Sequence, residues 1–546
     1  MAFPRYEATA PVFIRQLREQ FGERCMIVLD QQRMSYAEAD ARSAKLALGL
    51  LASGVVKGTR VGILFPNGPD WVVSFLATAR IGAIAVPLNT FFQPRELAWM
   101  LRHADVHTLL TITRFLKHDY LERLEAGVPE LAEAGEGPLR IASLPNLRSV
   151  FSWGEGSSER AWSSEGEALA ALPVAPGDET LLRAAEDSVS PADPLLILYS
   201  SGSTADPKGA IHSHGAVIRH SFNLFSRRDL KPEDRVWSPM PFFWVGGLVF
   251  ALMGNLHAGA TTLCEEVFDP ETTLRFLERE RVTVAVGWPH FGKALADHPT
   301  RHDRDLSCLR AGNVPDLLPE EIVPLDPELR PNALGMTETC GPHTWGGDGV
   351  LPESLRGSFG KALEGVEHKV VDPNSGETLA PGEFGEICVR GYNLMLGLHK
   401  IERADTFDAD GYYHTGDGGF FDAEGTLYFK GRLGDMIKTA GANVTPSEVE
   451  EAMASLPQIK HAYVVGVPHP DRGQSVAAAV VLEADDDTSV PLLKKAIKAQ
   501  LAAYKVPKHL YVYADNSRLP FTDSGKIDKR RLEKFLAARI DAGELG

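Results

Sequence analysis

The first part of the chain alternates short apolar runs with a helical pattern. Residues Arg60–Phe65 ("RVGILF") form an apolar run, which the turn-forming residues Asn67–Asp70 end. A helical pattern follows over Trp71–Arg80, and a second apolar run occupies Ala83–Leu88. Two wholly apolar strands joined by a helix are typical of a parallel sheet that is covered on both faces. We therefore predict an α/β subdomain here.

The same alternation returns farther along the chain. Residues Leu195–Leu198 are predicted to form a buried strand, and apolar residues recur at helical spacing over 218–225, after a polar loop. A second alternating unit is predicted over Arg235–Thr344. The stretch Glu367–Arg390 has a polar turn between two alternating runs, which predicts a hairpin and thus a small antiparallel barrel or sheet.

A smaller unit is predicted after residue 433. Thr445 is expected to cap a helix, with Pro446 at its first position and Glu448 completing a capping box. Two strands and a further helix are predicted at Ala462–Val467, Val476–Leu482 and Leu492–Leu501. The predicted fold class is α/β: a large N-terminal domain of two parallel-rich α/β subdomains plus a small β-barrel, followed by a small α+β C-terminal domain.

Composition and charge narrow the choice of partners. The 546 residues, 44% hydrophobic and 24% charged, have the balance of a globular protein with two or more packed units. Lys and Arg number 56 against 73 Asp and Glu; the net charge of −17 disfavours nucleic acid and anionic lipid as partners. No stretch predicts a transmembrane segment or a secretory signal, and five scattered cysteines predict reduced thiols, so we expect a cytoplasmic protein. Its oligomeric state, monomer or homodimer, is left open.

One loop is rich in glycine and small hydroxyl side chains. Residues Tyr199–Gly209 read "YSSGSTADPKG". The backbone N–H groups of such a loop can surround a phosphate, and its lysine adds positive charge. The spacing is not that of the Walker loop, because five residues separate Gly202 from Lys208 and Pro207 precedes the lysine. From these residues alone, a phosphate-binding loop and a surface loop without a ligand both remain open.

The loop closely resembles Y-[ST]-S-G-[ST]-T-G-x-P-K-G, the phosphate loop of a superfamily of acyl- and aryl-CoA synthetases, peptide-synthetase adenylation domains and beetle luciferases. Ala205 stands where the family usually has a glycine. Four more segments resemble the family's motifs in the family's order: Asn332–Gly341, Tyr412–Gly425, Gly431–Glu450 and Leu519–Leu532. The resemblance covers nearly the whole chain. It implies an ATP-dependent ligase that forms an acyl-AMP and then an acyl thioester, usually with coenzyme A.

The resemblance implies a role in the ATP site for each matched residue. Thr337 would bind the α-phosphate, and Glu338 would help to hold Mg²⁺. Asp417 would accept the ribose hydroxyls with support from Arg432, and Lys526 would reach the carboxylate and the α-phosphate together. The loop would bind the β- and γ-phosphates through Ser200, Ser201, Gly202, Ser203, Thr204 and Lys208. Further nucleotide contacts would come from Asn313, Leu334, Gly335 and Met336.

The second half-reaction is expected to use the C-terminal domain. By the resemblance, Lys438, Gly441 and Ala442 would line the channel for coenzyme A, with Lys438 in a catalytic role. The family's C-terminal domain rotates between the half-reactions about a pivot that falls on Gly434 here, and glycine accepts the change in φ that a pivot needs. The expected domains are residues 1–432, which bind AMP, and 435–546, which move, with a hinge at 433–434.

Two departures from the family pattern concern specificity. Leu334 stands where most members have an adenine-stacking Tyr, which predicts somewhat weaker ATP binding. Trp244 replaces a common His that gates the acyl site, although core packing is an equal alternative for this side chain. By the resemblance, the acyl pocket comprises Trp244, Val245, Gly246, Gly247, Gly287, Ala311, Gly312 and Cys340, beside Asn313, Gly335 and Met336. Its many glycines predict room for a medium- to long-chain or bulky cyclic carboxylic acid.

Other functions share these motifs. An adenylating enzyme could deliver the acyl group to a separate carrier protein, a nucleotide-binding regulator could lack catalysis, and a luciferase-type oxidase could act on the adenylate. His214, which matches a family histidine after the loop, is either a ligand contact or a structural residue at a helix start.

Overall fold

The computed structural model describes residues 3–544 apart from 158, 172–176, 201–206, 319–321, 323, 325, 348, 440–441, 470–472, 484–488, 502–504 and 523–524. The chain folds into two compact units. The first comprises Met1–Glu367 and Val389–Tyr413, and the second comprises His368–Cys388 and His414–Gly546. This division differs from the predicted one because the second unit includes most of the small sheet that precedes residue 433. The hinge at 433–434 stays a prediction.

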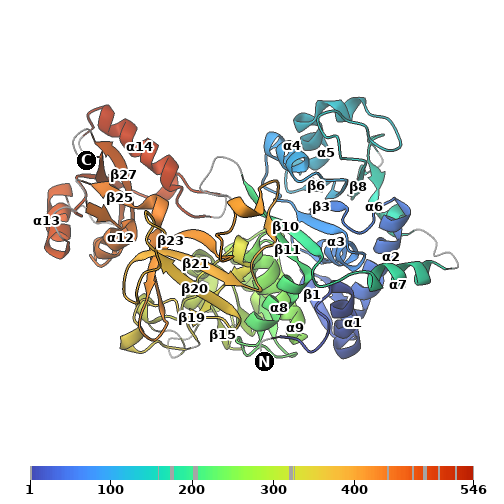
Figure 1. Ribbon diagram of the computed structural model, residues 1–546, viewed down its shortest axis with the longest axis horizontal. Helices are drawn as coiled ribbons and strands as arrows, with labels where there is room; N and C mark the ends of the chain where they lie inside the picture. The colour runs from blue at the N-terminus through green and yellow to red at the C-terminus, as the bar shows by residue number, and fades with distance from the viewer. Residues whose placement is uncertain are drawn as a thin grey trace. The chain divides into compact units, whose positions relative to one another are not determined.

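The first unit contains an eight-stranded sheet in the order β22-β11-β10-β4-β3-β5-β8-β9 (Figure 1). From β10 to β9 neighbouring strands run parallel, whereas β11 and β22 pair antiparallel. Helix α3 (Pro69–Arg80) connects β3 to β4, so the predicted strand–helix–strand unit is confirmed. The strands are β3 (Arg60–Leu64), β4 (Ile84–Pro87), β5 (Thr108–Ile112), β8 (Ser149–Trp153), β9 (Ser164–Glu165), β10 (Pro194–Ser200), β11 (Lys208–Ser213) and β22 (Gly397–Leu398).

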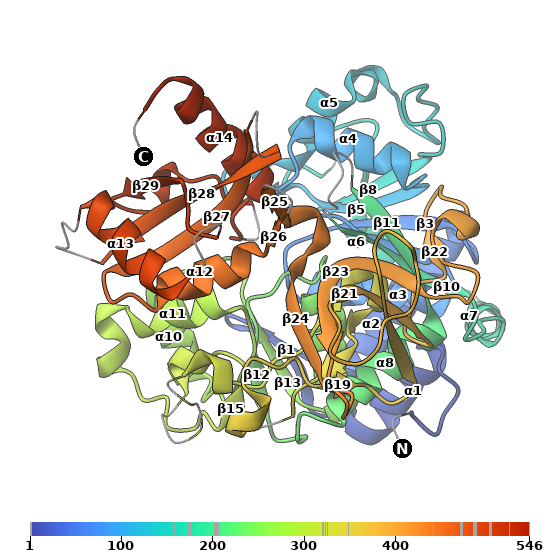
Figure 2. The ribbon, with the colours of Figure 1, turned by 60° about the vertical axis from the view of Figure 1, so that its left-hand side comes forward.

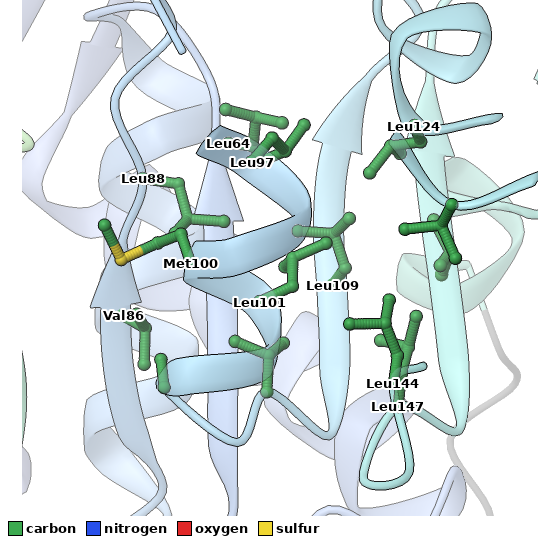
Figure 3. Packing of buried hydrophobic residues seen from close by; sticks show 14 of the residues in the cluster. Leu64, Val86, Leu88, Leu97, Met100, Leu101, Leu109, Leu124, Leu144 and Leu147 are labelled. Carbon is green, nitrogen blue, oxygen red and sulfur yellow. The ribbon is translucent and has the colours of Figure 1, made fainter. Parts of the chain in front are cut away.

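Helices α4 (Pro94–His103) and α5 (Tyr120–Gly127) cover one face of this sheet. The apolar residues Leu97, Met100 and Leu101 share one side of α4, because residues three and four apart do so in a helix. Figure 3 shows these side chains directed toward the strands, where Val86 and Leu109 face them. Full burial of one such side chain contributes roughly 1.5–3 kcal/mol, so this contact anchors α4 to the sheet.

The first unit contains a second sheet, of six strands, in the order β15-β14-β12-β13-β1-β2. All its pairs are parallel except the β1–β2 hairpin. Its strands are β1 (Cys25–Leu29), β2 (Gln32–Ser35), β12 (Arg235–Trp237), β13 (Thr261–Cys264), β14 (Val284–Ala285) and β15 (Ala311–Gly312). Helices α10 (Pro270–Arg279) and α11 (Pro289–Ala296) and a π-helix (Gly246–Met253) follow its strands. Two parallel-rich α/β subdomains are thereby confirmed.

The glycine-rich loop joins two antiparallel strands, β10 and β11, and only then does a helix begin. We predicted a helix after the loop and did not predict β11. Helix α8 (His214–Phe225) starts with Ser213 as its N-cap, whose hydroxyl accepts a hydrogen bond from Ala216 N (3.1 Å). His214 is fully buried and its Nδ1 accepts from Ala10 N (3.1 Å), which supports the structural alternative for this residue.

The second unit contains a four-stranded sheet and a five-stranded sheet. The four strands are β20 (Val366–Val371), β21 (Gly385–Gly391), β23 (Tyr413–Phe421) and β24 (Leu427–Arg432). Of these, β20, β21 and β23 each have one end in the first unit. The five are β25 (Ile437–Thr439), β26 (Ala442–Val444), β27 (Ile459–His469), β28 (Gly473–Leu482) and β29 (His509–Tyr513). Ala478 and Val480 pack with α12 (Pro446–Ala454) and α13 (Val490–Gln500), whereas Ala479 and Val481 pack with α14 (Lys529–Asp541). This alternation puts helices on both faces, as Figure 2 shows.

The capping box predicted for α12 is wrong. Thr445 is the N-cap and Pro446 occupies the first turn, but the Thr445 side chain makes no capping hydrogen bond. Its hydroxyl lies 3.4 Å from Met436 Sδ, and the Glu448 carboxylate pairs with Lys505. The Glu448 carboxylate thus pairs with a lysine from a distant part of the chain and does not complete a capping box with Thr445.

All five cysteines are free thiols, in agreement with the sequence. Among the helices that the structure describes, none combines the length and the apolar character that a membrane crossing requires.

Candidate active site

The β10–β11 hairpin presents the two ends of the predicted phosphate loop. Ser200 ends β10 and Lys208 begins β11, and the two residues are register partners across the hairpin. Ser201, Gly202, Ser203 and Thr204, predicted phosphate ligands, lie outside the described residues. The hairpin geometry brings the first hydroxyl and the lysine of the motif side by side, as a loop that encloses a phosphate requires.

A hydrogen bond fixes the side chain of Glu338 to Ser200, the last residue of β10. Its carboxylate oxygen Oε1 accepts a hydrogen bond from Ser200 Oγ at 3.0 Å. Glu338 is buried, with only 6% of the residue exposed. Its carbonyl accepts from Met395 N at 3.0 Å. A carboxylate and a hydroxyl next to a phosphate loop are hard oxygen donors, the type that suits Mg²⁺ bound to a nucleotide. These residues therefore fit the predicted metal role.

Thr337 precedes Glu338 in a short 3₁₀ turn that His212 holds. The Nε2–H of His212 donates to the Thr337 carbonyl at 2.8 Å. Complete burial lowers the pKa of His212 to about 4, so the ring is neutral at pH 7 with its proton assigned to Nε2. His212 lies on β11, four positions after Lys208, and was not predicted as a site residue. The sequence carried no signal for it, because strand β11 itself was not predicted.

Two of the predicted residues, Gly287 and Asn313, follow the carboxyl ends of β14 and β15 in the six-stranded sheet. Asn313, which follows β15, accepts a hydrogen bond through Oδ1 from Gly287 N at 2.9 Å. Leu334 is buried, and its N–H donates to Thr344 Oγ1 at 2.9 Å. Gly335 and Met336 form the two-residue strand β16, which pairs with Gly341–Pro342. Ligands bind at this edge in many open parallel sheets.

Aromatic rings surround Trp244. Its ring centroid lies 5.0 Å from that of Phe243 and 5.5 Å from that of Trp288, and Trp288 stacks on Phe291 at 5.7 Å. Trp244 and Trp288 are half-buried, and Trp288 packs against a buried apolar cluster, so core packing and a place in the acyl site both stay open for Trp244. Val245 lies just before the π-helix that begins at Gly246. Trp288 and Phe291 were not predicted, although "GWPHF" places them directly after Gly287.

The glycines of the predicted acyl pocket do not all provide space. A Cβ on Gly247 would lie 2.0 Å from the Pro241 carbonyl oxygen, and one on Gly312, at φ +146°, would lie 1.9 Å from the Ala285 carbonyl oxygen. Backbone packing requires these two glycines. Gly246 and Gly287 have more room, with nearest atoms at 3.3 and 3.4 Å. Cys340 is fully buried, which raises the pKa of its thiol.

The predicted ribose site lies in the second unit. Asp417 and Arg432 are register partners on β23 and β24, and Arg432 Nε lies 2.8 Å from Asp417 Oδ1. Arg432 also donates through Nη1 to the Thr415 carbonyl at 2.9 Å. Asp417 is 3% exposed, so the arginine orients a carboxylate that would accept the two ribose hydroxyls.

Three further side chains converge beside Asp417. Ligand atoms of Glu386, Cys388 and His414 all lie within 4.8 Å of one another. His414 Nδ1 is 2.8 Å from Glu386 Oε2, and Gly416 N donates to Glu386 Oε1 at 2.9 Å. Thiol, imidazole and carboxylate are zinc-ligand types, but these hydrogen bonds already account for the arrangement, because they hold His414 and Gly416 of β23 against Glu386.

Lys526 lies in the turn between β29 and α14. Its backbone is held by Thr522, whose N–H donates to the Lys526 carbonyl at 2.8 Å, while its side chain is exposed. Of the predicted coenzyme A residues, Lys438 and Ala442 are described for the backbone alone, on β25 and β26, and Gly441 lies outside the described residues.

Comparison with known proteins identifies the chain. Residues 13–399 match the family model of AMP-binding enzymes, and residues 448–526 match that of the AMP-binding enzyme C-terminal domain. The putative acyl-CoA synthetase YngI of Bacillus subtilis is 30% identical, over 95% of this chain and 96% of the relative. The medium-chain acyl-CoA ligase ACSF2, mitochondrial, of Bos taurus is 30% identical, over 93% of this chain and 84% of the relative. ATP-bound MatB from Rhodopseudomonas palustris superposes with a TM-score of 0.79 at 26% identity, over 97% of this chain and 99% of the other.

The chain therefore belongs to the family of AMP-binding enzymes, and within it to the AMP-forming acid–CoA ligases. The resemblance of the five motifs and the predicted α/β fold are confirmed.

Proposed function

We propose that the enzyme activates a medium- to long-chain or bulky cyclic carboxylic acid with ATP and Mg²⁺ and transfers the acyl group to coenzyme A. The observation that carries this proposal is the hydrogen bond from Ser200 to Glu338 at the mouth of the β10–β11 hairpin. It joins the end of the phosphate loop to the turn that holds Thr337. The names of the relatives, an acyl-CoA synthetase and a medium-chain acyl-CoA ligase, support free coenzyme A over a carrier protein as the acceptor.

In the first half-reaction a carboxylate oxygen of the acid attacks the α-phosphorus, and pyrophosphate leaves with the electrons of the broken P–O bond. Two anions must approach one another, so catalysis depends on positioning and on positive charge. Lys208 at the hairpin and Lys526 in the second unit supply that charge, and Thr337 orients the α-phosphate. Glu338, held by Ser200, would bind Mg²⁺, which neutralises phosphate charge when bound.

In the second half-reaction the sulfur of coenzyme A attacks the acyl carbon, and AMP leaves with the electrons of the broken C–O bond. The strands that carry Lys438 and Ala442 would line the path of the thiol. The residues of the two half-reactions lie in two units, so we further propose that the C-terminal part pivots at 433–434. The five free thiols support a reducing, cytoplasmic compartment.

Production of AMP in the presence of fatty, aryl and alicyclic acids, with and without coenzyme A, tests the proposal. We expect AMP to accumulate only when a medium or bulky acid, ATP, Mg²⁺ and coenzyme A are all present. A strong preference for acetate would refute the proposed acid class. Dependence on a phosphopantetheinylated carrier protein in place of coenzyme A would refute the proposed acceptor.

A further inference from the structure

Tyr199 lies where β10 enters the predicted phosphate loop. It is buried and comes directly before Ser200, whose hydroxyl donates to Glu338. Its register partner across the hairpin is Gly209, the residue after Lys208. A Cβ on Gly209 would lie 3.0 Å from Cζ of Tyr199, so the tyrosine ring covers this glycine. The ring therefore packs across both strands of the hairpin, and on each strand a predicted phosphate ligand is the next residue.

The hydroxyl group of Tyr199 is held by His103, the last residue of α4. A hydrogen bond of 2.8 Å joins the Tyr199 hydroxyl to His103 Nδ1. The imidazole is stacked in turn on Trp99, with ring centroids 4.5 Å apart and an interplanar angle of 13°. Burial raises the pKa of Tyr199, so its hydroxyl keeps its proton at neutral pH. The stacked imidazole thus fixes the far end of the tyrosine ring.

His399 connects the same end of α4 to the second strand of the hairpin. Its backbone N–H, just after β22, donates to the Gly209 carbonyl at 2.7 Å. Its Nε2–H donates to the His103 carbonyl at 3.0 Å, and the two imidazole centroids lie 5.5 Å apart. Both strands are therefore tied to the end of α4, β10 through the Tyr199 side chain and β11 through its backbone.

An ion pair reinforces this connection. Lys400 Nζ lies 2.9 Å from Asp105 Oδ1, and these residues follow His399 and His103 closely in the chain. Both have a positive φ, +62° for Lys400 and +52° for Asp105. Residues other than glycine adopt this conformation uncommonly, and they keep it where surrounding contacts enforce it. The backbone on both sides of the connection is thus held in a defined shape.

The hairpin ends that depend on this connection face one part of the nucleotide. Ser200 and Lys208, which are register partners, are predicted to bind the β- and γ-phosphates. A change in the tilt of the Tyr199 ring would displace both, because one is its neighbour in the chain and the other adjoins the glycine beneath the ring. AMP lacks these two phosphates. It would contact Thr337 and Asp417, which lie outside the hairpin.

We propose that His103 is a positioning residue for ATP, which acts through the Tyr199 hydroxyl to place the hairpin ends that bind the β- and γ-phosphates. The inference rests on the proposed function and assigns a role to a residue outside all five sequence motifs. It predicts a selective effect, because the affinity for ATP depends on the hairpin and the affinity for AMP does not. A purely structural role would affect both nucleotides or neither.

Binding of the two nucleotides tests this inference without an acid substrate. Kd for MgATP and Kd for AMP would be measured by calorimetry with the full chain, as wild type, Tyr199→Phe, His103→Leu and His103→Asn. Tyr199→Phe removes only the hydroxyl, and the asparagine can still form a hydrogen bond near the position of Nδ1. Tyr36→Phe is the matched control, because the buried Tyr36 hydroxyl donates to the Ala260 carbonyl at 2.8 Å, next to β13 of the other sheet.

We expect Kd for MgATP to rise about three- to tenfold in Tyr199→Phe and His103→Leu, the effect of one lost hydrogen bond. Kd for AMP should stay within about twofold of the wild-type value in both variants, since AMP does not reach the hairpin. His103→Asn should recover part of the affinity for MgATP. Tyr36→Phe should bind both nucleotides as the wild type does.

Two results would overturn the inference. One is an unchanged Kd for MgATP in Tyr199→Phe, which keeps the ring and so decides the question even if His103→Leu does not fold. The other is an equal loss of affinity for MgATP and AMP, which would make the hydrogen bond a general support of the fold. A wild type that binds neither nucleotide would instead contradict the proposed function, so the two failures are distinguishable.

Discussion

At the scale of single residues, the groups expected to touch ATP depend on neighbours that do not touch it. Ser200 orients the Glu338 carboxylate, and His212 holds the carbonyl of Thr337. Both partners come from the hairpin that carries the phosphate loop, while Thr337 and Glu338 lie more than 120 residues later in the chain. These hydrogen bonds therefore hold Thr337 and Glu338 in position in their turn, which charge alone would not do.

Replacement of His212 tests this positioning. His212→Leu leaves the Thr337 carbonyl without its donor, so we expect kcat for ATP–pyrophosphate exchange to fall about three- to tenfold with little change in KM for the acid. His212→Asn, which can still donate a hydrogen bond, should recover part of the loss. His302→Leu, at an exposed histidine, is the control. An unchanged kcat in His212→Leu would show that the turn holds itself.

Glu265 gives a pH-dependent prediction at the same scale. Its Oε2 accepts from Trp237 Nε1 at 2.9 Å and its Oε1 from Thr273 Oγ1 at 2.9 Å. Burial raises the pKa of Glu265 from 4.5 to about 7. The folded state therefore holds this proton more tightly than the unfolded state, and the associated stability is present below about pH 4.5 and lost as the pH rises through 7.

Glu265→Gln cannot ionise, so it should not show this loss. Between pH 4.5 and 8 the free energy of unfolding of the wild type should fall by about 1–2 kcal/mol relative to that of the variant. This figure is smaller than the full pKa shift implies, because solvent screens a partly exposed carboxyl group. Chemical denaturation at both pH values measures the difference. A constant difference between the two proteins would contradict the raised pKa.

At the scale of elements, close approach of neighbouring strands decides where glycine is needed. Gly312 on β15 lies against Ala285 on β14, where a Cβ would be 1.9 Å from a carbonyl oxygen, at a φ of +146° that side chains rarely adopt. The parallel edge that carries Asn313 and the predicted acyl pocket therefore depends on this residue.

Gly312→Ala should lower the free energy of unfolding by about 2–3 kcal/mol, because the side chain is both strained and without space. Gly397→Ala, at a glycine with no atom within 4 Å of the new Cβ and no positive φ, should be nearly neutral. Denaturant unfolding of both variants gives the comparison. Equal stability of the two variants would contradict the tight strand packing.

The elements also show what sequence reasoning can reach. The strand–helix–strand unit around α3 was predictable because each apolar run has a local boundary in turn residues. Strand β11 was not, because six mixed residues after a loop carry little periodicity. The capping box failed because Lys505, 57 residues away, takes the Glu448 carboxylate. His212 escaped notice for the same reason, since its partner, the Thr337 carbonyl, is brought to it by tertiary packing.

At the scale of the whole molecule, the expected chemistry is divided between two units. Ser200, Lys208 and Glu338 belong to the first, whereas Asp417, Arg432 and Lys526 belong to the second. The family motifs predicted both sets because each motif is local in sequence. The net charge of −17 means that the few lysines of these motifs must attract ATP and the acid without help from the overall field.

The central claim is that Lys526 from the second unit supplies positive charge to the acid and the α-phosphate during the first half-reaction. The most direct measurement compares the two half-reactions in Lys526→Ala, with Lys534→Ala as a matched control at an exposed lysine on α14. ATP–pyrophosphate exchange should fall by about 10²–10³-fold in Lys526→Ala, while transfer of a supplied acyl-AMP to coenzyme A stays near the wild-type rate. An unchanged exchange rate, or an equal loss of both half-reactions, would contradict the account.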